Sequence, residues 1–149
     1  MTLSLFLHVL SIVGWVGGMF FAYMALRPIA ASVLEPPQRL TLWAGVFGKF
    51  FPWVWLSVAL ILASGLYMLH LMGGAAPKYA YVMFALGVIM MLIFGHVFFS
   101  PYKKLKLDVA AHDWQSGAAA LAQIRRLVGI NLSIGLVTIA VVFVGRALG

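Results

Sequence analysis

Residues 79–100, YAYVMFALGVIMMLIFGHVFFS, decide the fold class, because these 22 consecutive residues contain no Asp, Glu, Lys or Arg. A helix needs about 20 apolar residues to cross the hydrocarbon core of a bilayer. Three other stretches have similar length and apolar character, namely residues 3–26, 50–72 and 127–147. The sequence therefore predicts an all-α integral membrane protein, a four-helix bundle that forms a single transmembrane domain over residues 1–149.

The composition supports this prediction and excludes several classes of protein. Hydrophobic residues make up 64% of the chain and charged residues only 9%, whereas a soluble domain has about 25% charged residues. So few charges cannot cover the surface of a soluble enzyme domain. The net charge of +7 does not indicate a nucleic-acid partner, since the basic residues lie between apolar spans. With no Cys, disulfides, iron–sulfur clusters and thiolate metal sites are excluded.

The distribution of Lys and Arg predicts the orientation. Ten basic residues divide eight to two between the two sides of the membrane. The eight lie in the first and third connections, at Arg27, Arg39, Lys49, Lys103, Lys104, Lys106, Arg125 and Arg126. Because cytoplasmic connections are enriched in Lys and Arg, we expect both termini to face outward from a bacterial inner membrane. Short cytoplasmic interfacial helices are expected at residues 39–49 and within 101–126, the latter with a turn at Ser116-Gly117.

Three of the four histidines lie inside predicted spans, where polar side chains are costly and usually face the bundle interior. His8 and His70 each lie within about one or two helical turns of the outer surface, at a rise of 1.5 Å per residue. We expect these two side chains to share one site. His96 lies roughly 20–25 Å further inward. It cannot join that site and is expected near Asn131.

Two neutral imidazoles at matched depth on facing helices are the arrangement that binds haem b. The first hypothesis is therefore a haem b-binding membrane protein with a redox or electron-transfer role, in which His8 and His70 bind the iron. A redox partner or quinone and a homo-oligomer are compatible with this role, and enzymatic activity stays open. The further cofactor-binding candidates are His96, Trp15, Arg27, Arg125, Arg126 and Asn131. Their arginines could hold propionates or lipid head groups.

The same histidines also suit copper, since imidazole and thioether groups bind Cu(I). Met68 and Met72 flank His70 at spacings of two residues and provide thioethers for a copper site with His8 and His70. A third hypothesis is a structural or assembly subunit in which the histidines only pack. A proton-relay or ion-channel role is not expected, because no Asp or Glu lies in any span.

Short motifs carry a family resemblance. They are Leu7-His8-Val9-Leu10, Trp15-Val16-Gly17-Gly18-Met19-Phe20, Arg27-Pro28, Phe50-Phe51-Pro52-Trp53-Val54-Trp55, Ser64-Gly65-Leu66-Tyr67 and Gly95-His96. Together they resemble the small four-span proteins of the copper resistance D (CopD) family and the related HemJ-type protoporphyrinogen oxidases. The CopD resemblance implies copper uptake or resistance. The HemJ resemblance implies haem b binding with His8 as the best-matched ligand. Porphyrinogen oxidation is not implied, because that group's intramembrane Lys and its Asn-Glu-x-Pro run are missing.

Overall fold

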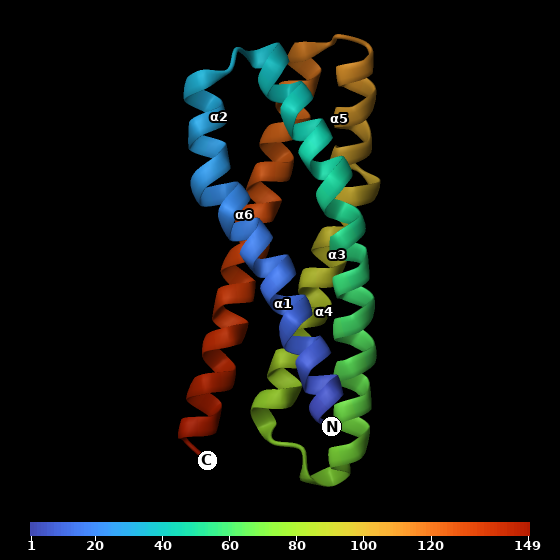
Figure 1. Cartoon of the computed structure of the whole chain (residues 1–149), viewed down its shortest axis with the longest axis vertical. Coiled ribbons are helices and arrows are strands. Elements are labelled where there is room, and N and C mark those ends of the chain that lie inside the picture. Colours follow the sequence, from blue (N-terminus) through green and yellow to red (C-terminus); the bar gives the residue numbers. More distant parts are fainter.

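The computed structural model describes residues 1–149, and nearly all of them are helical (Figure 1). The elements follow in the order α1 (Thr2–Phe21), η1 (Ala22–Leu26), α2 (Arg27–Val33), α3 (Pro36–Met72), η2 (Gly73–Ala75), α4 (Lys78–Phe99), α5 (Pro101–Ala110) and α6 (Trp114–Ala147). They form four long rods of 32, 40, 33 and 34 residues, each apolar enough to cross a membrane. The predicted all-α, four-span membrane fold is confirmed.

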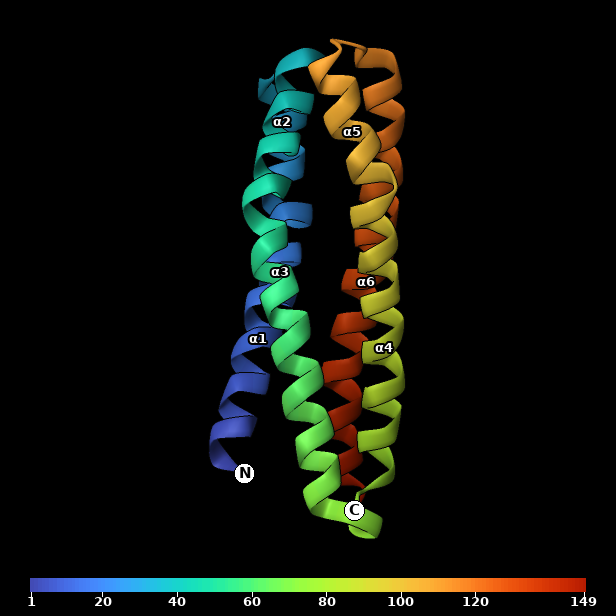
Figure 2. The same ribbon diagram turned by 90° about the vertical axis from the view of Figure 1, so that its right-hand side faces the viewer.

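The rods are arranged as two antiparallel hairpins. Helix α1 packs along α3, and the rod α4–α5 packs along α6, whereas η1 contacts α6 and α2 diverges from α3 (Figure 1). Figure 2 shows the first hairpin on the left and the second on the right. Both chain termini lie at one end of the bundle, and the turns at 34–35 and 111–113 lie at the other (Figures 1 and 2). By contrast α3 and α4, although joined by the short η2 turn, touch each other little.

The connections differ from the prediction. Residues 39–49 do not form a separate interfacial helix, because they are the first part of α3, which continues through Pro52. Residues 114–126 likewise continue into the fourth span as α6. At 1.5 Å per residue the rods are about 50–60 Å long, whereas the hydrocarbon core is about 30 Å thick. Each rod is therefore longer than the hydrocarbon core is thick, and basic residues such as Arg39, Lys104 and Arg125 lie toward the end opposite the termini.

Capping and packing explain why α3 begins early and stays continuous. Glu35 and Gln38 form a capping box at its start, and Pro36 occupies the first turn, where a missing N–H costs nothing. The buried residues that follow recur at helical spacing and pack on the other rods. They are Leu40, Trp43, Phe47, Phe51 and Val54. This buried face holds the extension in line with the span.

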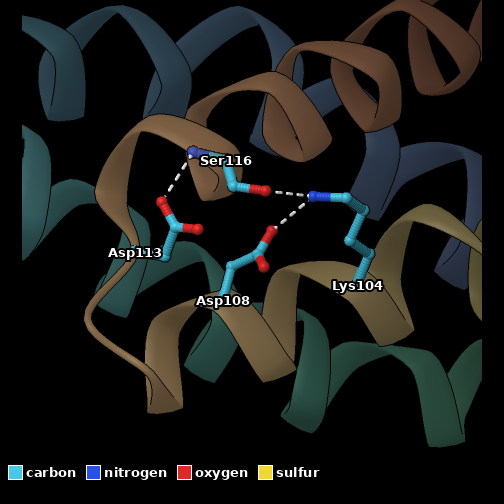
Figure 3. Close-up of polar contacts among 4 residues, drawn as sticks. All are labelled: Lys104, Asp108, Asp113 and Ser116. Atoms are coloured by element: carbon cyan, nitrogen blue, oxygen red, sulfur yellow. Dashed lines mark hydrogen bonds and ion pairs between the residues drawn. The ribbon is translucent and has the colours of Figure 1, made fainter.

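The turn between α5 and α6 lies at residues 111–113, a few residues before the predicted Ser116-Gly117 turn. Asp113 caps α6, because its carboxylate accepts a hydrogen bond from the backbone N–H of Ser116 at 3.2 Å. Figure 3 shows this cap beside a second set of contacts. The ammonium of Lys104 donates to Asp108 at 2.7 Å and also to the Ser116 hydroxyl. These polar contacts fasten the end of α5 to the start of α6.

An aromatic cluster joins the two hairpins in the middle of the bundle. The Phe51 ring lies at its centre, with ring centroids 4.9 Å from Tyr102, 5.3 Å from Phe94 and 5.0 Å from Phe47. Trp15 of α1 meets Phe94 edge to face at 6.1 Å. The cluster connects α1, α3, α4 and α5. It therefore sets the relative position of the two hairpins, and with it the positions of the residues discussed next.

Candidate functional site

His8 is the one histidine that the structure buries. It lies on the inward face of α1 together with Ser11, Trp15, Val16 and Met19. Only 6% of its surface is exposed. Its Nδ1 atom is 3.0 Å from the hydroxyl oxygen of Ser64 on α3. The contact therefore joins α1 to α3 through two residues that are 56 positions apart in the chain.

The hydrogen bonds of Ser64 fix the tautomer of His8. The Ser64 oxygen lies 2.5 Å from the carbonyl oxygen of Leu60, and a carbonyl can only accept, so the single hydroxyl hydrogen must point there. The hydroxyl oxygen can then only accept from His8, which places the imidazole hydrogen on Nδ1. The lone pair is left on Nε2. A second group that holds one ring nitrogen in this way is typical of metal-binding histidines.

The surroundings of His8 are close-fitting on the α3 side. A Cβ atom on Gly65 would lie 3.4 Å from Cε1 of His8, so the glycine allows the imidazole ring to lie against α3. Ser64 and Met68 are both buried and stand four residues apart, on one face of the helix. Met72 continues this row toward the end of α3 and is half-buried. At 1.5 Å per residue, Met68 lies about 6 Å and Met72 about 12 Å beyond Ser64 along the helix, so of the two thioethers Met68 is nearer the level of His8.

His70 does not lie in this row. Its side chain is exposed, and it stands six residues beyond Ser64, the residue that lies level with His8. At 1.5 Å per residue the two histidines are offset by about 9 Å along the bundle. The structure thus does not bring together the predicted His8–His70 pair. It offers no second histidine beside His8 for a haem iron.

His96 is also separate from its expected neighbour. Its side chain is exposed near the end of α4. Asn131 is buried and donates from Nδ2 to the carbonyl oxygen of Met90 at 3.3 Å, six residues or about 9 Å from His96 along the helix. No group of three or more His, Cys, Asp or Glu side chains gathers anywhere in the structure. A metal ion in this chain would therefore need thioether or backbone ligands besides histidine.

The remaining candidates fall into two groups. Trp15 and Asn131 line an apolar cavity of about 300 Å³ in the middle of the bundle. Arg27 and Arg125 line a smaller cavity of about 170 Å³ further from the termini. Arg125 and Arg126 are both exposed, and Arg126 lines neither cavity. The predicted cofactor-binding residues therefore do not form one site. His8 is buried toward the termini, whereas Trp15, Asn131, Arg27 and Arg125 line the two cavities further along the bundle.

Two residues important to these places were not among the predicted site residues. Ser64 appeared only within a family-like motif, although a serine inside an apolar span is itself a signal for a buried partner. Arg39 was assigned to topology alone, yet it lines the smaller cavity. Arg39 reaches this cavity because α3 begins at Pro36 and continues into the span without a break. The sequence instead predicts a separate helix at residues 39–49.

Comparison with known proteins identifies one family model that matches most of the chain. Residues 44–144, which run from α3 almost to the end of α6, match the family model described as copper resistance protein D. No curated protein and no solved structure matches the chain. The match covers more than half of the 149 residues. This multi-pass membrane protein therefore belongs to the copper resistance protein D family.

Proposed function

We propose that this protein binds Cu(I) within the membrane and handles copper in uptake or resistance, with His8 as the principal ligand. Family membership supports a role related to copper. One structural observation carries the choice of ligand: a buried imidazole whose Nδ1 is bonded to Ser64, which leaves Nε2 free to bind a metal ion. Metal-binding histidines are held by such a partner on the other nitrogen.

The thioether of Met68 is the second ligand in this proposal. It is buried on the same face of α3 as Ser64, one helical turn toward the chain termini, and Met72 lies one turn further along that face. Sulfur of thioethers and neutral imidazole nitrogen select Cu(I) among the common metal ions. The absence of any Asp or Glu from the spans also favours a monovalent ion, because an uncompensated charge in the bilayer is costly.

The haem b hypothesis lacks comparable support. It required His8 and His70 at one level, and the two are offset along the bundle. The copper proposal needs only His8 and the methionine face of α3. His70 takes no part in this proposal, although it is close in sequence to Met68 and Met72, because its side chain is exposed and lies on another face of α3.

Competition for Cu(I) against a chromophoric chelator tests the proposal on protein purified in detergent. We expect wild-type protein to bind one Cu(I). His8→Ala should abolish binding, and Met68→Leu, which conserves volume, should weaken it. His70→Ala is the matched control and should bind as wild type does. Equal loss in His8→Ala and His70→Ala, or no binding by wild type, would contradict the proposal. If wild-type protein shows a Soret band after haem supplementation and His8→Ala does not, the result would favour haem b over copper.

A further inference from the structure

Two adjoining cavities occupy the bundle between the His8 region and the end opposite the termini. The larger, of about 300 Å³, is apolar: 15 of its 17 lining residues are hydrophobic. The smaller, of about 170 Å³, has Arg27, Arg39 and Arg125 in its wall. The residues common to both walls are Ala22, Phe47 and Val128. An apolar cavity that adjoins a cationic one has the character of a site for an amphiphilic ligand.

Each cavity is lined by a residue that has an unpaired buried polar atom. Only two buried side-chain nitrogen or oxygen atoms in the structure lack a hydrogen-bond partner, Nε of Arg39 and Oδ1 of Asn131. Arg39 lines the smaller cavity and Asn131 the larger one. Asn131 is only 3% exposed, so bulk water does not satisfy it. Unpaired buried polar groups are rare in native proteins, and here the donor belongs to a residue in the wall of the smaller cavity and the acceptor to a residue in the wall of the larger one.

The charge of the smaller cavity is not neutralised by the protein. The only ion pair of the protein joins Lys104 and Asp108, on α5. Arg39 donates from Nη2 to the backbone carbonyl oxygens of Leu34 at 3.2 Å and Ala31 at 3.5 Å, which are not charged. Arg27 donates from Nε to the carbonyl oxygen of Tyr23 at 3.2 Å, and its guanidinium carbon lies 4.3 Å from the centre of the Tyr23 ring. These contacts orient the Arg27 side chain and leave its terminal nitrogens available. Guanidinium groups match carboxylates and phosphates, which accept two parallel hydrogen bonds.

The first rod is irregular beside both cavities. Residues Ala22–Leu26 form a π-helical segment, and Arg27 begins α2 directly after it. Single π-helical turns inside α-helices occur frequently at functional sites. Ala22 and Leu26 line the apolar cavity, whereas Tyr23 and Arg27 line the arginine cavity. The irregular turn thus contributes side chains to both parts of the space.

We infer that the two cavities form one binding site for an anionic amphiphile. Its carboxylate or phosphate head binds Arg27, Arg39 and Arg125, and its apolar body fills the larger cavity. Arg125 and Asn131 stand six residues apart on α6, or about 9 Å along the helix. A hydroxyl or N–H group at that depth on the apolar body donates to Oδ1 of Asn131. This site is separate from His8 and does not depend on the copper proposal.

Binding of three probes to detergent-purified protein tests the inference by native mass spectrometry. Oleate and phosphatidylglycerol carry a carboxylate and a phosphate, and phosphatidylcholine is the zwitterionic control. We expect at least one anionic probe to bind more tightly than phosphatidylcholine. Binding of phosphatidylglycerol alone identifies a phospholipid as the occupant, and binding of oleate alone identifies a free acid. Failure of both anions, or equal binding of phosphatidylcholine, would overturn the inference.

Adjacent arginines on α6 supply a matched pair of variants. Arg125→Gln should weaken binding of the anionic probe about tenfold or more, because hydrogen bonds to charged groups are strong. Arg126→Gln removes the same charge outside the cavity and should leave binding unchanged. Equal effects of the two substitutions would show only general attraction to a basic surface and would overturn the site.

The Asn131 part of the inference has its own readout. Replacing oleate by 12-hydroxyoleate adds one hydroxyl group to the same chain, and we expect about two- to tenfold tighter binding from one neutral hydrogen bond. Asn131→Leu should abolish this difference between the two probes while both still bind. An unchanged difference in Asn131→Leu would show that Asn131 does not contact the ligand.

Discussion

The hydrogen bond from His8 to Ser64 leads to the sharpest prediction. Ser64→Ala removes the acceptor that holds the imidazole hydrogen on Nδ1, at 3.0 Å in the structure. It leaves the ring buried, at 6% exposure, with a free choice between two tautomers and orientations. Alanine fits the space of serine, so the helix pair itself should remain intact.

The size of the effect follows from what the bond does. Removing the partner of a metal-binding histidine typically lowers metal affinity about 10–100-fold, which corresponds to about 1.4–2.8 kcal/mol. We expect a loss of this size in Cu(I) affinity for Ser64→Ala. Without copper, the ring nitrogen that loses its partner should also lower the free energy of unfolding by about 1–3 kcal/mol, the usual cost of a buried unsatisfied polar group.

Two measurements check these expectations. Competition with a Cu(I) chelator gives the affinity, and nitrogen NMR of labelled histidine gives the tautomer of His8 directly. Ser64→Thr keeps a hydroxyl group and should retain both the Cu(I) affinity and the His8 tautomer of the wild type. Ser57→Ala, at a half-buried serine two turns earlier on α3, is the control and should change neither. Wild-type Cu(I) affinity in Ser64→Ala, alongside complete loss in His8→Ala, would refute the reasoning from the tautomer.

Two further predictions concern stability. A Cβ atom on Gly145 would lie 2.6 Å from Cβ of Tyr79, so Gly145→Ala should force α6 from α4 and lower the free energy of unfolding by about 1–3 kcal/mol. Gly87→Ala, where a Cβ meets no atom within 4 Å, should instead be neutral or stabilising in the same thermal unfolding assay; similar losses would contradict the packing argument. The hydrogen bond from Lys104 holds the pKa of Asp108 below its ordinary value. The stabilisation should be complete above the ordinary carboxyl pKa and disappear as the pH falls through the lowered one. Melting temperatures of wild type and Asp108→Asn should therefore converge in acid, and a constant difference would argue against the pair.

The sequence determined the membrane fold because that fold depends on lengths and charges. A bilayer has a fixed thickness, so a charge-free run such as residues 79–100 specifies a spanning helix without reference to any other part of the chain. Four such runs specify four spans. The absence of Cys and of intramembrane acids likewise restricted the chemistry to histidine and methionine before any geometry was known.

Only the tertiary structure decided which side chains face inward. In a soluble helix the buried face is recognised by its contrast with a polar face, but lipid is as apolar as the bundle core, so this contrast vanishes within a span. The sequence predicted inward-facing side chains for His8, His70 and His96 alike, because a histidine within a span is costly to expose to lipid. The structure buries the first against Ser64 and exposes the other two.

The ends of the helices depended on tertiary contacts as well. Sequence reasoning placed boundaries where hydropathy falls, near Lys49 and Leu127, because it followed transfer into hydrocarbon alone. Aromatic packing of Phe47 and Phe51 against Tyr102 continues the bundle beyond that boundary. The continued rods bring Arg39 and Arg125 to one cavity. Apolar length thus fixed the spans in the sequence, whereas contacts between distant residues fixed the helix faces and the cavities.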